Sequence, residues 1–376
     1  MHDLLVVGGG VTGLSVAVHG ARAGLAIVLA EAGGLGGVST QRSGALVRTH
    51  YADARSARLA LAGLQDFEAF AERYGGPAGF VATGFAYVPG EAERADGSFG
   101  ERVRMLCSIG VRTELLDAAA LHRIDPAIAL DGDGVVAFER SGYADPAQTT
   151  ATLAAAARAE GVDLRPYTRV ERLLCGGDGA LTQGGRAIGA ASTVLCAGAW
   201  SAGLAAGAGV TLEIRATAVK LAFVSRSVRA HLTMIDAPNG IYRRPDGATG
   251  TLVGRRTWTD EPLDGPPARS CGRRRGVRRR CRERLARRLP SAAAGHVLAA
   301  RAGMLDMTPD GLPLVGPSAC PGLWLCCGWS GAGFKTGPSV GAALAPWIAG
   351  GEAPRELAAL HPARELVAVA GARSPH

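Results

Sequence analysis

The chain has 376 residues, 47% of them hydrophobic, and a formal net charge of +8, so it is long enough to bury the cores of about two domains. No stretch of about 20 strongly apolar residues predicts a transmembrane helix, and the first apolar run lacks the basic segment of a secretory signal. Eight scattered cysteines without metal-site spacing favour reduced thiols in a cytoplasmic protein and predict no metal site.

The start of the chain has the order of a dinucleotide-binding unit: an apolar strand, a glycine-rich turn, a helix, a second apolar strand and an acid. These are, in order, residues 4–7, Gly8, Gly10 and Gly13, residues 14–23, residues 25–30, and Glu31. In such a unit the glycines permit a tight turn, close approach to a pyrophosphate and close helix–strand packing. The helix start suits phosphates and the acid suits a ribose. The pattern predicts a dinucleotide site.

The next part of the chain changes from a loop to a helix and then to short strands. Residues 32–44 are rich in glycine and hydroxyl side chains, which allows a loop to lay its backbone along a cofactor. Residues 59–74 carry leucine and aromatic side chains at helical spacing and predict an amphipathic helix that ends at Gly75. Residues 80–140 mix short apolar runs with turn residues and predict part of a β-rich domain.

The second half predicts a return to the nucleotide-binding domain. Asp145 and Pro146 have the types expected at a helix start, and residues 162–174 predict a strand. A strand over 193–197 enters a turn of small residues, and residues 210–295 are again β-rich.

Strand-like runs over 312–317 and 323–327 precede a last glycine-rich loop at 328–337. A helix is predicted to begin at Pro338 and to end before Gly350, with its positive dipole end near this loop. The sequence thus predicts an α/β protein with two interleaved domains. They are a Rossmann-like domain at 1–78, 142–208 and 300–376, and a β-rich substrate domain at 79–141 and 209–299.

The positive charge is concentrated in Arg269–Arg288, which holds eleven arginines and one acid and leaves a net charge of −2 for the remaining chain. An apolar residue recurs there at every fourth position, at Val277, Cys281, Leu285 and Leu289, and Pro290 follows. This pattern predicts a basic helix with a narrow apolar stripe. One interpretation is a surface helix in an arginine-biased chain, and another is a docking site for an acidic protein partner. A nucleic-acid partner is not favoured, because no aromatic residues interleave with the arginines.

With these elements in place, the chain resembles the D-amino-acid oxidase family of FAD-dependent oxidoreductases, and within it the sarcosine oxidase and glycine oxidase branch. The motifs that carry the resemblance span nearly the whole chain. They are the opening unit and the segments 44–48, 142–146, 195–201, 307–313 and 328–335. The last two mark the family's C-terminal flavin loop, so the resemblance implies FAD and not NAD, with a cofactor domain of the glutathione reductase type.

The resemblance also implies site residues. Cofactor contacts are expected at Gly8, Gly10, Val11, Thr12, Gly13, Glu31, Ala32, Ser39, Thr40, Arg42, Ser43, Gly44, Val170, Ala197, Gly198, Trp200, Gly303, Gly331, Gly333, Phe334, Lys335 and Thr336. In sarcosine-oxidase-like enzymes an arginine before the long helix and a lysine in the C-terminal loop hold the substrate carboxylate, and the matching residues here are Arg48 and Lys335. His50, Tyr51 and Tyr242 are further pocket candidates, each with core packing as the alternative.

The implied reaction oxidises the C–N bond of a small amino acid or N-alkyl amino acid related to sarcosine, glycine or proline. Hydride passes to flavin N5 and the resulting imine is hydrolysed by water. Gly303 stands where some relatives carry a cysteine joined to the flavin, and Arg42 where others carry a histidine, so non-covalent FAD is expected.

Two questions about the reaction stay open. The lysine that activates oxygen in sarcosine-oxidase-like relatives is missing between Leu252 and Gly254, and Lys220 is a candidate substitute. Reoxidation by O2, as in an oxidase, and by another electron acceptor, as in a dehydrogenase, are therefore both considered. A third interpretation is a flavin-fold subunit that binds a partner or carrier through the arginine-rich helix.

Overall fold

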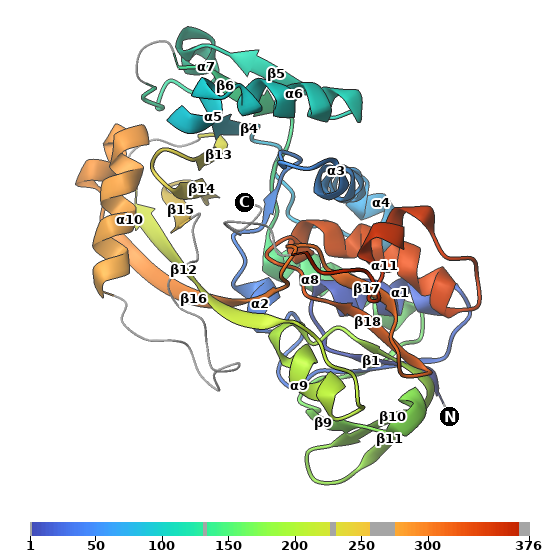
Figure 1. Cartoon of the computed structure of the whole chain (residues 1–376). Helices are drawn as coiled ribbons and strands as arrows, with labels where there is room; N and C mark the ends of the chain where they lie inside the picture. Colours follow the sequence, from blue (N-terminus) through green and yellow to red (C-terminus); the bar gives the residue numbers. More distant parts are fainter. Residues whose placement is uncertain (1, 131–133, 226–230, 256–274, 368–376) are drawn as a thin grey trace.

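The computed structural model describes residues 2–130, 134–225, 231–255 and 275–367, which form two large sheets with covering helices (Figure 1). The first sheet has the order β17 (Leu314–Pro317), β18 (Leu323–Cys327), β11 (Ala187–Leu195), β1 (His2–Val7), β2 (Ile27–Ala30) and β8 (Asp163–Arg165), with β10 (Gly179–Thr182) and β9 (Val170–Leu173) attached to β11. The second has the order β16 (Val297–Met307), β12 (Arg215–Ser225), β15 (Gly250–Arg255), β14 (Ile241–Asp246), β13 (Thr233–Asp236), β4 (Phe85–Val88), β6 (Val136–Glu139) and β5 (Thr113–Leu116). A short ladder joins β3 (Leu46–Val47) to β7 (Gly142–Tyr143).

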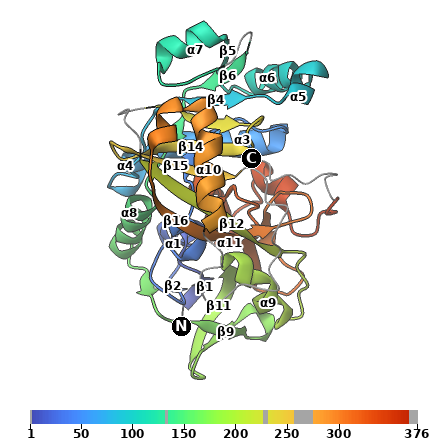
Figure 2. The same cartoon turned by 90° about the vertical axis from the view of Figure 1, so that its left-hand side faces the viewer.

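The helices lie mainly between and outside these sheets (Figures 1 and 2). They are α1 (Val11–Arg22), α2 (Val38–Gln41), α3 (Ala54–Glu68), α4 (Phe70–Tyr74), α5 (Glu91–Ala95), α6 (Ser98–Ser108), α7 (Ala118–Ile124), α8 (Pro146–Ala159), α9 (Ser201–Ala206), α10 (Arg275–Arg288) and α11 (Gly333–Ile348). The mixed α/β architecture expected from the sequence is confirmed. Within the described ranges, no helix is long and apolar enough to cross a membrane.

The first sheet is built around β1, which pairs in parallel with β11 on one side and β2 on the other. Side chains alternate along a strand, so the two faces of β1 contribute to two cores. Leu4 and Val6 pack with α1, α8 and α11, whereas Leu5 and Val7 pack with β9, β10 and α9. Both faces are therefore covered, which is why this segment is an uninterrupted apolar run.

Three predicted boundaries differ from the structure. Helix α1 begins at Val11 and not at residue 14, because the backbone of Gly10 is extended and forms the N-cap. The strand predicted over 162–174 is two strands with different neighbours, separated by a turn in which Tyr167 has a φ of 57°. Helix α11 begins at Gly333 and contains Pro338. Small residues pack its first turns closely: a Cβ at Gly337 would lie 2.6 Å from Thr12 Cγ2. This packing outweighs the local preference of proline for a helix start.

One face of the second sheet packs against α6 and Leu46 of β3, and the other face packs against α10 (Figure 2). The apolar stripe predicted for the basic helix is confirmed in the described part, where Cys281, Leu285 and Leu289 pack against β12, β14 and β15. The side chain of Val277 and residues 269–274 lie outside the described residues. Strand β16 spans the boundary predicted at residue 300, and it pairs along its length with β12.

Candidate active site

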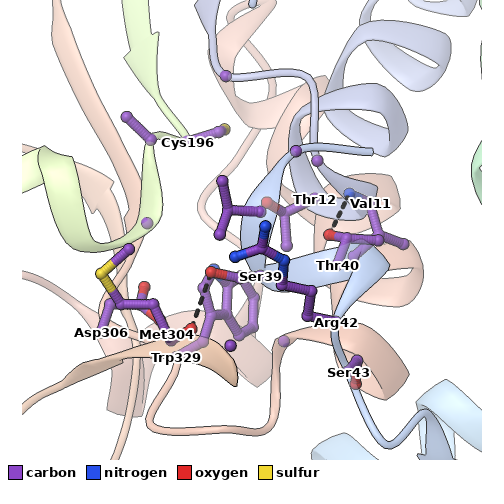
Figure 3. Close-up of a pocket in the computed structure, with 18 of the residues that line it drawn as sticks. Val11, Thr12, Ser39, Thr40, Arg42, Ser43, Cys196, Met304, Asp306 and Trp329 are labelled. Carbon is purple, nitrogen blue, oxygen red and sulfur yellow. Dashed lines mark hydrogen bonds between the residues drawn. The ribbon is translucent and has the colours of Figure 1, made fainter. Parts of the chain in front are cut away.

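A cavity of about 1030 Å³ lies between the two sheets. On one side the start of α1 and the segment 39–43, which comprises most of α2 and the two residues after it, form the wall of the cavity. On the other side Met304, Asp306 and Trp329 line it (Figure 3). Most of the residues predicted to contact the cofactor line it: Gly8, Gly10, Val11, Thr12, Glu31, Ala32, Ser39, Thr40, Arg42, Ser43, Gly44, Val170, Ala197, Gly198, Trp200, Gly303, Gly331, Gly333, Phe334 and Lys335. Arg48, predicted to hold the substrate carboxylate, and the pocket candidate Tyr242 also line it.

Gly13 and Thr336 do not line the cavity. A Cβ at Gly13 would overlap the carbonyl oxygen of Gly8, so this glycine holds α1 close to β1, as the motif requires, without facing a ligand. Thr336 is turned back into its own helix and donates to the carbonyl oxygen of Ala332 at 3.1 Å. Both residues thus lie behind the cavity lining, and their predicted cofactor contacts stay predictions.

The opening turn has the geometry of a phosphate cradle. Gly8 has a φ of 110°, a conformation that favours glycine, and a Cβ there would lie 2.5 Å from the carbonyl oxygen of Cys196. Val11 donates its N–H to Thr40 Oγ1 at 3.2 Å, which ties the start of α1 to α2 (Figure 3). The backbone can therefore approach a pyrophosphate closely at the positive end of a helix.

Glu31 is fixed by the loops on either side of it. Its Oε2 accepts the N–H of Gly9 at 2.7 Å, and its Oε1 accepts the N–H of Gly33 at 2.8 Å. Each carboxylate oxygen has a second lone pair, so these bonds leave acceptor capacity toward the cavity. The predicted role of Glu31 as a ribose acceptor stays a prediction.

The last glycine-rich loop is anchored by Asp306, which sequence reasoning missed. Its carboxylate accepts the N–H of Gly328 at 2.7 Å, and its carbonyl oxygen accepts the N–H of Ser330 at 2.9 Å. Burial raises the pKa of Asp306 to about 6, against the opposing effect of the backbone N–H groups of Trp329, Asp306 and Gly328. The position of this acid directly before the segment 307–313 was the signal that could have identified it. Asp306 joins the second sheet to the loop at the other wall of the cavity.

Two buried cations meet at Tyr51. The guanidinium of Arg48 lies over the phenol ring, 4.2 Å from its centroid, and Nζ of Lys335 donates to Tyr51 Oη at 2.8 Å. The exposed fractions of Arg48 and Lys335 are only 1% and 3%. Burial, with a further contribution from Arg48, lowers the pKa of Lys335. Burial acts to raise the pKa of Tyr51, but Lys335 and Arg48 outweigh it and the net shift is downward. The segment after β3 and the first turn of α11 thus bring two cationic side chains to the same tyrosine at the cavity wall.

His50 lies behind this wall and not in it, which fits core packing, the alternative to its predicted pocket role. Its Nδ1 lies 3.0 Å from Oε1 of Glu139, and its ring stacks on Tyr87 with 4.2 Å between centroids. Burial lowers the pKa of His50, although Glu139 acts in the opposite direction. Tyr51 is likewise outside the lining, beneath Arg48 and Lys335.

Tyr242 occupies space that two glycines leave open. A Cβ at Gly44 would lie 2.7 Å from its ring, and a Cβ at Gly254 would overlap the ring. Burial raises the pKa of Tyr242, so the phenol stays protonated at neutral pH. Strand β12, which pairs with β15, turns Val219 into the cavity, and strand alternation therefore turns Lys220 away from it. Lys220 is thus not placed to substitute for the missing lysine.

Comparison with known proteins gives the context for this geometry. The profile of the family described as FAD dependent oxidoreductase, abbreviated DAO, matches residues 3–347. The chain belongs to this family. It is 26% identical to a glycine oxidase of Geobacillus kaustophilus, over 92% of this chain and 93% of that protein. It is 25% identical to a sarcosine oxidase subunit beta of Rhodobacter capsulatus, over 94% of this chain and 86% of that protein.

Solved structures show a similar fold. The L-proline dehydrogenase of P. horikoshii superposes with a TM-score of 0.86, at 23% identity and 96% coverage of both chains. The glycine oxidase of Geobacillus kaustophilus gives 0.85, at 24% identity, with 97% of this chain and 99% of that chain covered. The residues of the cavity fit FAD, because the glycine cradle and the helix start suit a pyrophosphate and the C-terminal loop closes the other end.

Proposed function

We propose that the protein oxidises the C–N bond of a small amino acid or N-alkyl amino acid with FAD as cofactor. The observation that carries this proposal is the convergence of Arg48 and Lys335 in the cavity of a DAO-family chain. A carboxylate is the group that two buried cations at one point would bind. The names of the glycine oxidase and sarcosine oxidase relatives support the same substrate class.

The side chains of this site bind and orient, and none is needed to transfer a proton at the reacting carbon. Arg48 and Lys335 would hold the substrate carboxylate, Tyr51 would hold the two cations together, and Tyr242 would form an apolar wall beside the substrate. The bound FAD would supply the chemistry by accepting the hydride. Orientation of the bound substrate in the cavity is the contribution of the protein.

An anaerobic screen tests this function. The purified yellow protein is mixed under nitrogen with amino acids and N-methyl amino acids, and bleaching of the flavin absorption is measured. Bleaching by at least one small amino acid is expected, and bleaching by none of them would reject the proposal.

The electron acceptor divides this proposal into two versions. The first version is reoxidation by O2, and the alternative is an acceptor-linked dehydrogenase. Two observations favour the dehydrogenase: Lys220 is turned away from the cavity, and the ring of Tyr242 fills the space beside Gly254, near the position of the missing lysine. After bleaching, the return of colour is followed with air or with an artificial dye. Fast return only with the dye would identify the dehydrogenase.

FAD is expected to be bound without a covalent link. Gly303 lines the cavity and has no side chain to form one, and Arg42 donates instead to the carbonyl oxygen of Ala302 at 3.2 Å. Acid precipitation should therefore release all of the yellow colour into the supernatant. Colour that stays in the pellet would show a covalent flavin.

A protein partner at α10 is a further part of the proposal. The side chain of Arg279 is 76% exposed there, whereas Arg288 is buried in an ion pair with Asp236 at 2.9 Å. The exposed arginines would suit an acidic protein surface, and the name sarcosine oxidase subunit beta supports assembly with other subunits. We also propose the cytoplasmic location expected from the sequence, which cell fractionation would test.

A further inference from the structure

A buried carboxylate lies behind the cation pair and has no role in the reaction described above. Glu139 is the last residue of β6, and its exposed fraction is 1%. Burying an ionised carboxylate is costly unless several hydrogen-bond donors satisfy it. The donors that contact Glu139 therefore indicate its role.

The donors to Glu139 come mainly from one short segment. Its Oε2 accepts Thr49 Oγ1–H at 2.6 Å and Thr49 N–H at 3.2 Å, and its Oε1 lies 3.0 Å from His50 Nδ1. A more distant hydroxyl, Thr113 Oγ1, lies at 3.5 Å. Because burial lowers the pKa of His50, the ring is neutral and donates its Nδ1–H to the carboxylate. Three of the four donors therefore belong to the two residues that follow Arg48.

This segment also fixes the guanidinium. Nη1 of Arg48 donates to the carbonyl oxygen of His50, so the arginine folds back onto the residue that Glu139 holds. A chain of hydrogen bonds therefore connects the carboxylate of Glu139 to Thr49 and His50, and the carbonyl oxygen of His50 to the guanidinium of Arg48. On the other side Arg48 lies over Tyr51, which accepts from Lys335.

We propose that Glu139 is a positioning residue that sets the guanidinium of Arg48 and thereby the affinity of the site for a carboxylate. The inference rests on the proposed function, since it assigns the carboxylate-binding role to Arg48. Glu139 does not line the cavity and does not touch the substrate. Its effect is predicted to be specific for ligands that carry a carboxylate, because a neutral ligand would not use the guanidinium charge.

The test uses the FAD-loaded full chain with Glu139→Gln, which keeps the shape and removes the charge. The probes are the amino acid that bleaches the wild-type flavin best, its primary amide, and benzoate as a carboxylate that carries no C–N bond. Benzoate binding is read from the perturbed flavin absorption. We expect the benzoate Kd and the amino-acid KM to rise by about 10- to 100-fold, with kcat and the affinity for the amide nearly unchanged.

Matched variants separate positioning from folding. Asp236→Asn removes another buried carboxylate of the same sheet, one that pairs with Arg288 on the α10 side, and should lower the melting temperature without changing the ratio of carboxylate to amide affinity. Thr49→Val removes one donor to Glu139 and should shift this ratio in the same direction by a smaller factor, while Thr49→Ser should restore it. The Thr49 pair decides the question if Glu139→Gln does not fold.

The outcomes are distinct. A Glu139→Gln protein with a lower melting temperature but the wild-type ratio would overturn the inference and leave a purely structural role. If Arg48→Met changes the ratio and neither Glu139→Gln nor Thr49→Val does, the inference fails and the proposed function stands. If Arg48→Met has no effect on the ratio, or no amino acid bleaches the wild type, the proposed function fails and the inference with it.

Discussion

Replacing Lys335 by methionine is expected to lower kcat/KM for the amino-acid substrate by at least about 100-fold, because a buried charged partner of the substrate carboxylate is lost. Methionine keeps the apolar stem of the side chain and removes the ammonium. The phenol of Tyr51 also loses the donor that lies 2.8 Å away. Most of the loss should appear in KM, since a carboxylate is bound equally in the ground state and the transition state.

The chain supplies a matched control for this variant. Lys220 is its only other lysine, and β12 turns it away from the cavity. Lys220→Met should keep kcat/KM within about twofold, because it leaves the cavity wall unchanged. The pH dependence gives a second measurement: benzoate affinity should fall as the pH rises through the lowered pKa of Lys335, and this fall should be absent in Lys335→Met. Equal kcat/KM values for the two methionine variants would contradict the assignment.

Replacing Gly13 by alanine is expected to give a protein that has lost most of its FAD. A Cβ there would overlap the carbonyl oxygen of Gly8 and lie 3.3 Å from Cβ of Cys196. Helix α1 cannot move outward freely, because α11 packs on its other side and Ser15 donates to the carbonyl oxygen of Pro338 at 2.7 Å. The added methyl group would therefore overpack this contact at a cost of about 1–3 kcal/mol. The resulting distortion of the glycine turn should weaken FAD binding by about 10- to 100-fold.

The ratio of flavin to protein absorbance after gel filtration measures this loss. Gly189→Ala is the matched control, since a Cβ at that position in β11 meets no atom within 4 Å. It should keep the wild-type ratio and melting temperature. Full FAD content in Gly13→Ala would show that α1 and β1 can separate without cost to the site.

The cofactor half of the molecule was the part most open to prediction from the sequence. Glycine spacing, the apolar strand before it and the acid after it are local features, and each has a local mechanical reason. The place of Arg48 opposite Lys335 could be proposed only through the family resemblance, because 287 residues separate them along the chain. The structure brings the two side chains together, and their role remains a proposal.

The supporting residues were harder to predict because their partners are distant in sequence. His50 and Tyr51 lie two and three residues after Arg48 in the sequence. Nothing in the local sequence indicates that hydrogen bonds to Glu139 and Lys335 hold these two side chains outside the cavity lining. Strand periodicity shows that Val219 and Lys220 face opposite sides, but not which side is the cavity. Pro338 is a good local signal for a helix start, and the close packing of Gly337 on Thr12 outweighed it.

The central position of β1 bears on how the molecule is made. Its pairing with β2 is available once residue 30 has been synthesised, but its other edge waits for β11, whose paired residues end at Leu195. At about 5–20 residues per second, ribosomal synthesis separates these two events by roughly 10 to 30 seconds. During that interval the edge of β1 stays unpaired. A nascent chain would therefore carry its glycine motif for about half of translation before β11 can pair with β1. Lys335, which lines the opposite wall of the cavity, is synthesised only near the end.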